Sequence, residues 1–173
     1  PTCTQLLGDY GADVIKVEPP AGDPLRKWRY IHDDTSVWWA AHARNKRSIT
    51  IDLRQPEGQD LVRRLAQQAD ILIENFRPGA MEKWGLGFEA LHEINPKLIM
   101  LRVSGYGQSG PYKDRPGFGV IGEAMGGLLY LSGEPGRPPV RVGVSIGDTL
   151  SGLHGVIGIM MALRHREMQN GVG

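Results

Sequence analysis

A long apolar segment near the end of the chain reads Val140-Arg-Val-Gly-Val-Ser-Ile-Gly-Asp-Thr-Leu-Ser-Gly-Leu-His-Gly-Val-Ile-Gly-Ile-Met-Met-Ala-Leu163. In its second half, large apolar residues recur at steps of three and four, which predicts a helix with an apolar face. Three small residues, Ser151, Gly155 and Gly158, favour close approach of neighbouring elements to this helix. We therefore expect a buried helix here.

Asp148 is the one ionisable carboxylate of this segment, and it lies where strand-like spacing gives way to helical spacing. Asp is a preferred N-cap, so a structural cap is the simplest interpretation. In the first turn of a helix, unpaired backbone N–H groups and the helix dipole also keep a carboxylate ionised. The position therefore has two interpretations, a helix cap and a carboxylate nucleophile, and the rest of the chain has to decide between them.

The composition is typical of one soluble globular domain. Of 173 residues, 40% are hydrophobic and 23% charged, and the formal net charge is +1, so no overall charge favours nucleic acid or an anionic membrane. Cys3 is the only cysteine and the five histidines are scattered, which predicts a reducing cytoplasm and no metal site. The uncharged run Thr149–Leu163 is shorter than the roughly 20 residues that cross a bilayer, so we expect no membrane span.

Strand-like segments alternate with helical segments along the chain. This order, together with apolar strands, predicts an α/β fold with a Rossmann-like parallel sheet covered by helices on both faces. We expect strands at residues 13–18, 48–53, 71–74 and 98–103, and helices at 4–10, 36–43, 56–69, 80–84, 88–94 and 120–131. The chain starts at Pro1 inside a helical pattern, so we expect residues 1–173 to be part of the large domain of a longer protein.

Two short motifs match catalytic fingerprints. Residues 105–110 match G-x-G-x-x-G after a strand, but prolines follow where a phosphate-binding helix should begin. Residues 143–147 match the nucleophile elbow G-x-S-x-G around Ser145. A serine hydrolase also needs an acid and a histidine after the serine, and His154 and His165 lie too close in sequence to swing back. We therefore favour neither a dinucleotide site nor a serine hydrolase.

Several motifs in the same order resemble the class III (CaiB/BaiF-type) CoA-transferases, which include formyl-CoA:oxalate and carnitine CoA-transferases. The motifs are Leu6–Glu18, Gly22-Asp23 with Arg26, Asn45–Ile49, Glu74–Gly79, Gly105–Pro111, Arg115–Gly117 and Gly147-Asp148. The resemblance implies an acyl-CoA enzyme whose two chains interlock as a homodimer. It also implies that the small domain and a glycine-rich lid lie outside residues 1–173.

The resemblance also assigns roles to single residues. Asp148 matches the catalytic aspartate, whose carboxylate attacks the acyl-CoA thioester to give a mixed anhydride and then an aspartyl-CoA thioester. The positions that match contacts to coenzyme A are Ile51, Arg54, Asn75, Phe76, Arg77, Lys83 and Trp84. The expected substrates are an acyl-CoA and a small carboxylic acid, without a metal.

Two alternatives remain open. The superfamily also contains α-methylacyl-CoA racemases, in which a histidine occupies the loop position of Phe118 in this chain. Phe cannot transfer a proton, so the resemblance favours a transferase over a racemase. The other alternative is a relative that binds CoA without catalysis.

Overall fold

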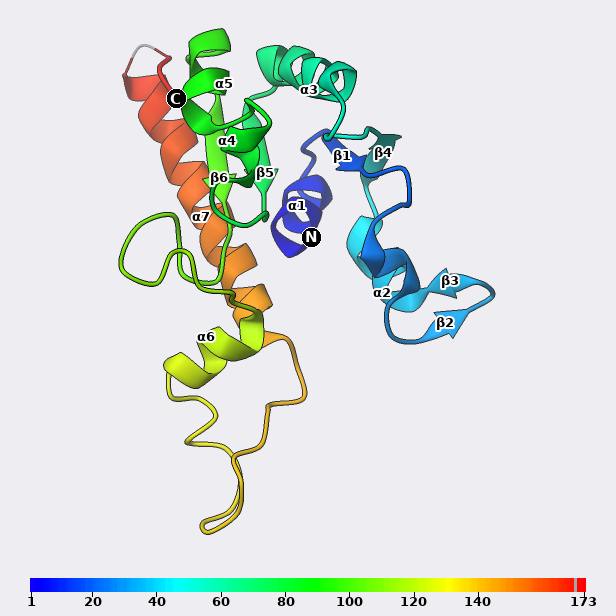
Figure 1. Ribbon diagram of the computed structural model, residues 1–173, viewed down its shortest axis with the longest axis vertical. Helices are drawn as coiled ribbons and strands as arrows, with labels where there is room; N and C mark the ends of the chain where they lie inside the picture. Colours follow the sequence, from blue (N-terminus) through cyan, green and yellow to red (C-terminus); the bar gives the residue numbers. More distant parts are fainter. Residues whose placement is uncertain (170) are drawn as a thin grey trace.

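The computed structural model describes residues 1–169 and 171–173 as a mixed α/β chain (Figure 1). The helices are α1 (Thr2–Asp9), η1 (a 3-10 turn, Pro24–Lys27), α2 (Val37–Ala43), α3 (Pro56–Gln68), α4 (Ala80–Lys83), α5 (Phe88–Ile94), α6 (Gly119–Met125) and α7 (Ile146–Met168). The strands are β1 (Val14–Glu18), β2 (Ile31–His32), β3 (Thr35–Ser36), β4 (Lys46–Thr50), β5 (Ile71–Glu74) and β6 (Ile99–Arg102).

The described strands form three separate pairs. β1 and β4 run parallel, with Glu18 opposite Thr50, and β5 and β6 run parallel, with Glu74 opposite Arg102. β2 and β3 form a short antiparallel hairpin that the sequence analysis did not predict. The predicted α/β class with parallel strands and covering helices is therefore confirmed, and within the described residues the parallel strands lie in two pairs.

Most predicted elements lie within a few residues of their observed bounds. The strand predicted at residues 48–53 is shifted. The observed β4 starts at Lys46 and ends at Thr50, which pairs with Glu18 at the end of β1. The helix predicted to reach residue 131 is shorter, because α6 ends at Met125 and two glycines follow, the second with a φ of 81°. Glycine adopts this left-handed conformation without steric cost, so it ends the helix.

One hydrophobic core joins the helices α3, α4 and α5 to the strand ends. Its buried members are Ile51, Val62, Ala66, Met81, Leu86, Leu91 and Leu98. Trp84 and Leu53 pack against this cluster, so the segment after β4 and the segment after β5 share one core. The burial fixes both segments relative to each other.

The long helix α7 packs on α1, α6 and β6 (Figure 1). Gly152 and Gly155 are buried, and an added Cβ there would lie 2.9 Å from Thr2 Cβ and 2.8 Å from Leu101 Cδ2 respectively. The prediction that small residues allow close approach is thus confirmed at Gly155. It is wrong at Gly158, where a Cβ would meet open space.

The expectation that α7 is a buried helix is wrong for most of its length. Six of its large apolar side chains are exposed, namely Leu150, Leu153, Ile157, Met160, Met161 and Met168. Helix α7 is long and apolar enough to cross a membrane. Core helices of soluble proteins also meet these two criteria. Its first turn carries the charged Asp148, and one side of the helix packs on other elements, as in a globular protein.

Gly152→Ala should destabilise the fold and Gly158→Ala should stabilise it. Both changes raise helix propensity by up to about 1 kcal/mol, but the new methyl group at residue 152 collides with Thr2 and with the backbone of Cys3. We expect the free energies of unfolding of the two variants to differ by about 2 kcal/mol, measured in urea. Equal stabilities would contradict the close contact between α1 and α7.

Candidate active site

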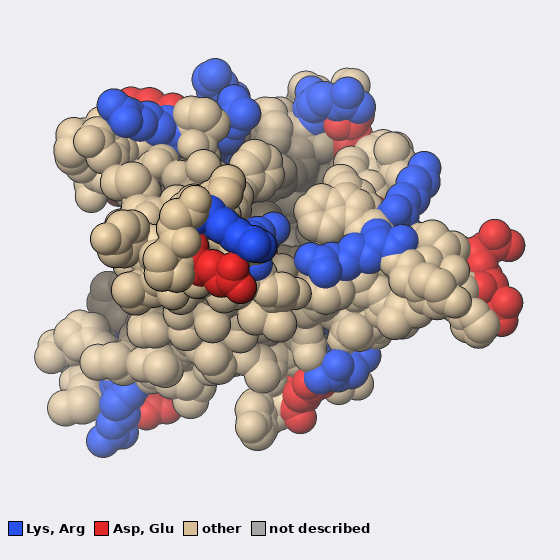
Figure 2. Space-filling model, turned by 90° about the horizontal axis from the view of Figure 1, so that it is seen from below, with Lys and Arg blue, Asp and Glu red and all other residues tan. Residues whose placement is uncertain are grey.

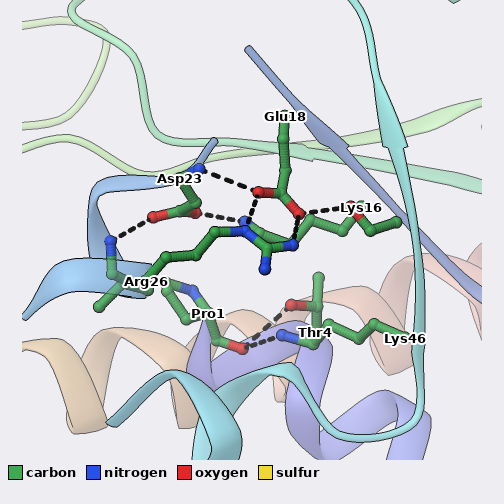
Figure 3. Close-up of polar contacts among 9 residues, drawn as sticks. Pro1, Thr4, Lys16, Glu18, Asp23, Arg26 and Lys46 are labelled. Atoms are coloured by element: carbon green, nitrogen blue, oxygen red, sulfur yellow. Dashed lines mark hydrogen bonds and ion pairs between the residues drawn. The ribbon is translucent and has the colours of Figure 1, made fainter. Parts of the chain in front are cut away.

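A buried carboxylate at the end of β1 fixes the loop that follows it. Glu18 is 2% exposed, and it accepts hydrogen bonds from Arg26 Nε at 2.7 Å, Arg26 Nη2 at 2.8 Å and the Asp23 backbone N–H at 2.9 Å (Figure 3). Ser48 Oγ on the neighbouring strand β4 donates a further hydrogen bond. These donors, above all Arg26, lower the pKa of Glu18 to about 2 despite its burial.

The same loop is stacked on helix α2 through two cation–π contacts. Arg26 Cζ lies 3.9 Å from the ring centroid of Trp39, and Arg29 Cζ lies 4.3 Å from that of Trp38. Ser36 caps α2 by accepting from Trp39 N at 3.1 Å, and its hydroxyl donates to the carbonyl of Trp28 at 2.7 Å. The loop and the helix therefore form one rigid unit.

A cavity of about 190 Å³ opens between this unit and the start of α7. It is lined by Thr2, Arg29, Trp38, His42, Gly143, Val144, Ser145, Asp148 and Thr149. Trp38 forms one wall of the cavity. Arg29 stacks on its ring, and the ring centroids of Trp38 and His42 lie 4.7 Å apart. Burial lowers the pKa of His42 below its ordinary value, so its imidazole is neutral at pH 7.

Asp148 is exposed to this cavity at the third position of α7. Ser145 is the N-cap, and within the described chain the Asp148 carboxylate accepts no hydrogen bond, so the interpretation of Asp148 as the N-cap is wrong. The first residue of α6 leaves room for the carboxylate, because a Cβ on Gly119 would lie 3.2 Å from Asp148 Oδ1. The start of α7 also lies close to the start of α6. This contact requires glycine at residue 147, because an added Cβ there would lie 2.9 Å from Gly119 O. The carboxylate is thus free to meet a ligand.

The two fingerprint motifs have other structural roles. Ser145 Oγ accepts from Arg29 Nη2 at 3.4 Å, and His154 lines a different cavity, beside Arg102 and Ser104. Gly105 lies against Gly117, where an added Cβ would be 2.5 Å from the Gly117 Cα atom. The glycine-rich loop of residues 105–110 is therefore closed by a backbone contact.

The first group of predicted CoA-binding residues follows β4. Arg54 is exposed and donates to the Asp52 carboxylate from Nε and Nη2, both at 2.9 Å. The Ile51 side chain is buried in the core, and its N–H donates to Glu18 O at 2.8 Å. A ligand on this segment therefore meets Arg54 and not the Ile51 side chain.

The second group follows β5. The ring of Phe76 is 40% exposed and packs edge-on against Trp84, with centroids 5.1 Å apart. Asn75, Arg77 and Lys83 are exposed around this pair. The structure thus brings an aromatic pair and two cations together at the end of a strand, where ligands of α/β folds bind.

The two predicted parts of the site do not share a cavity. None of the predicted CoA-binding residues lines the cavity of Asp148, which instead holds Arg29, Trp38 and His42. These three residues were not among the predicted site residues. Arg29 belongs to the basic cluster Arg26-Lys27-Trp28-Arg29, whose sequence is equally consistent with phosphate binding and with ordinary surface charge.

Among the described residues, no group of three or more His, Cys, Asp or Glu side chains is placed to hold a metal ion. Figure 2 shows one face of the molecule, where Lys and Arg side chains are scattered among uncharged residues. That face carries no continuous basic surface.

The parallel strand pairs and the carboxylate beside a cavity define a mixed α/β protein with an accessible acidic group. Comparison with known protein families identifies the family. The model of CoA-transferase family III matches residues 1–173. This chain belongs to CoA-transferase family III, as the resemblance predicted.

Named relatives and a solved structure agree with this family. The chain is 57% identical to a succinyl-CoA–D-citramalate CoA-transferase of Chloroflexus aurantiacus, over all of this chain and 43% of the relative. It is 42% identical to a succinate–glutarate CoA-transferase of Agrobacterium fabrum, over all of this chain and 45% of the relative. A CaiB/BaiF family protein from Brucella suis superposes with a TM-score of 0.92 at 44% identity, over 98% of this chain and 46% of that one. The chain therefore spans less than half the length of these relatives.

Glu18→Gln should destabilise the full-length protein at pH 7 by roughly 2 to 3 kcal/mol, measured by urea unfolding. The pKa of Glu18 is about 2 in the fold, below the value of about 4.3 in an unfolded chain. The ionised carboxylate therefore contributes its full stabilisation above pH 4.3, and loses it as the pH falls towards 2.

The matched control is Asp13→Asn, which breaks an exposed ion pair with Arg47. Such surface pairs contribute little, so we expect a change below about 0.5 kcal/mol. Parallel pH profiles for Glu18→Gln and the unchanged protein would contradict the role of Glu18.

Proposed function

We propose that the complete protein is an acyl-CoA:carboxylate CoA-transferase and that Asp148 is its covalent nucleophile. The observation that carries this proposal is the Asp148 carboxylate, which is exposed on a cavity and has no hydrogen-bond partner among the residues that the structure describes. The chain matches the transferase family over its whole length. A nucleophile needs a free lone pair and access to substrate, and a helix cap needs neither. Both conditions hold at Asp148.

The proposed reaction is two exchanges of the same kind. An Asp148 oxygen attacks the thioester carbonyl of the donor, the C–S bond breaks, and CoA thiolate leaves an acyl-aspartyl anhydride. The thiolate then attacks the Asp148 carbonyl carbon, which releases the donor acid and forms an aspartyl-CoA thioester. The acceptor carboxylate attacks that thioester and gives a second anhydride and free thiolate. Attack of the thiolate on the acceptor carbonyl forms the new acyl-CoA and regenerates Asp148.

The first turn of α7 supports the charge that develops during these steps. Among the described residues, the backbone N–H groups of Gly147 and Asp148 donate no hydrogen bond, whereas that of Ile146 donates to Val144 O and that of Thr149 to Ser145 O. The two free groups lie at the positive end of the helix dipole. Donors of this kind stabilise the oxyanion of a tetrahedral intermediate. The position of Asp148 as the third residue of α7 supports such a role for these N–H groups.

The binding of CoA is assigned to the exposed cations after β4 and β5. Arg54, Arg77 and Lys83 are exposed and suited to phosphate groups, and the pair of Phe76 and Trp84 offers an apolar surface beside them. The flexible arm of CoA would carry the thioester from this surface to the Asp148 cavity. Binding would exchange the Asp52 partner of Arg54 for phosphate.

The names of the relatives also support a class of acids. D-Citramalate, succinate and glutarate each carry two carboxylates, and the two named transferases act on them. We propose a small dicarboxylic acid as the acceptor. We further propose a cytoplasmic homodimer of interlocked chains, in which the exposed apolar face of α7 is covered.

Asp148→Asn should reduce CoA transfer by at least about 10³-fold and leave the Kd for CoA within about threefold, because the amide is a poor nucleophile of nearly the same shape. The full-length protein, incubated with acyl-CoA and then hydroxylamine, should be inactivated by a hydroxamate at Asp148. The control Asp34→Asn changes an exposed carboxylate on the hairpin and should keep full activity.

The alternatives give different results in the same assays. A relative that only binds CoA would bind it without any transfer and without hydroxylamine sensitivity. A racemase would exchange the α-proton of an acyl-CoA in D2O, with His42 as the acid/base group that Phe118 cannot provide. Proton exchange without transfer would contradict the proposal.

Arg54→Ala and Lys83→Ala should each weaken CoA binding about 5- to 20-fold at low salt and less at high salt, because exposed charge contacts are screened. Isothermal titration at two ionic strengths measures this. The control Arg137→Ala removes an equally exposed cation from a distant loop and should leave the Kd unchanged. Equal losses at both salt concentrations would argue against phosphate contacts.

A further inference from the structure

We propose that Arg29 binds the second, non-reacting carboxylate of the dicarboxylic acid acceptor and so determines substrate specificity. This inference rests on the proposed transferase function. It assigns a specific role to a residue that the family resemblance does not include among the matched site residues. The geometry of the cavity and the environment of the guanidinium carry the argument.

Arg29 and Asp148 line the same cavity and form no ion pair with each other. The guanidinium has one polar contact among the described residues, a long hydrogen bond of 3.4 Å from Nη2 to the neutral hydroxyl of Ser145. A guanidinium has five N–H donors, so most of its donors are free. The cation is therefore available to a ligand that reaches Asp148.

The charges of the cavity suit an acid with two carboxylates. Among the described residues that line it, Asp148 and Arg29 are the only charged groups, because His42 is neutral at pH 7. One carboxylate of the acceptor would react with the aspartyl-CoA thioester at Asp148. It loses its charge when it becomes an acyl group, so it then needs no cation as a partner. The other carboxylate would stay charged and meets its counter-charge at Arg29. Fork-shaped guanidinium donors match the two oxygens of a carboxylate.

The position of Arg29 is fixed in advance by its surroundings. Its guanidinium plane stacks on Trp38, which removes side-chain freedom before any ligand binds. Three residues earlier, Arg26 is held by the buried Glu18, so the backbone on one side of Arg29 is anchored. On the same side, the Trp28 carbonyl accepts from Ser36.

The backbone of Arg29 adds an independent indication. Its φ is 61°, in the left-handed region that residues with a side chain rarely adopt. This conformation has a steric cost, and such strain is concentrated at functional sites. A glycine would remove that cost but also the cation. This position is instead occupied by an arginine, whose side chain reaches Ser145, the N-cap of α7.

The test uses the full-length protein, with the methionine and lysine variants R29M and R29K and one donor, succinyl-CoA. The acceptors are glutarate and, as a monocarboxylate of the same chain length, valerate. Using a single donor cancels any effect on the donor. We expect R29M to lower the ratio of kcat/KM for dicarboxylic over monocarboxylic acids by about 100-fold, mostly through the KM of the dicarboxylic acids. R29K should restore part of the ratio, because it keeps the charge without the fork.

The matched control is Lys27→Met, a neighbouring exposed cation that does not line the cavity, and it should keep the ratio. An unchanged ratio in R29M, with transfer intact, would overturn the role of Arg29 and leave the proposed function standing. Equal losses for both classes of acid would also overturn it, because they would indicate a structural role. Absence of any transfer by the unchanged protein would instead refute the proposed function itself. The affinity for CoA, measured in parallel, should be equal in all variants and shows that they fold.

Discussion

The pairing of Glu18 with Arg26 is the interaction on which the candidate site depends. A nearly fully buried carboxylate without donors is strongly unfavourable, so the chain must bring Arg26, Ser48 and the Asp23 N–H to the end of β1. This requirement joins β1, β4 and the η1 turn. Once Arg26 is fixed, it stacks on Trp39, and the loop reaches α2 and the cavity. The ion pair at the end of β1 thus determines where the loop after β1 meets α2 and the cavity.

The second parallel pair uses the same device. Glu74 ends β5 with 5% exposure, and Arg102 on β6 donates to it from Nε at 2.7 Å while also pairing with Glu82 of α4. Each strand end therefore carries a buried Glu and a forked Arg, and each is followed by candidate binding residues. In both places the guanidinium is used for structure, so other cations, Arg29 and Lys83, remain for ligands.

The parts of the fold that depend on local pattern could be predicted from sequence. The alternation of strands and helices, the helix after residue 56 and the helix that continues after Asp148 agree with the spacing of apolar residues. Spacing alone left Asp148 as a helix cap or a nucleophile, and the family resemblance favoured the nucleophile. The hairpin could not be predicted, because its turn places Asp33 and Asp34 at positive φ, whereas Asn-Gly or Asp-Gly is the usual signal. The cavity was also missed, since it joins α1, α2 and α7, which are far apart in sequence. The exposed face of α7 was predicted to be buried because apolar spacing alone does not state which partner covers it.

The contact between α1 and α7 determines the order in which this part of the chain can be completed. During synthesis α1 leaves the ribosome long before the residues around Gly152 and Gly155 that pack against it. The strand pair of β1 and β4 can form early, but α1 has no partner on this side until α7 arrives. Cys3, which lies 6% exposed beneath those glycines, is therefore open to thiol chemistry in the nascent chain and protected in the finished one. The accessibility of the Cys3 thiol thus reports whether α1 has packed against α7.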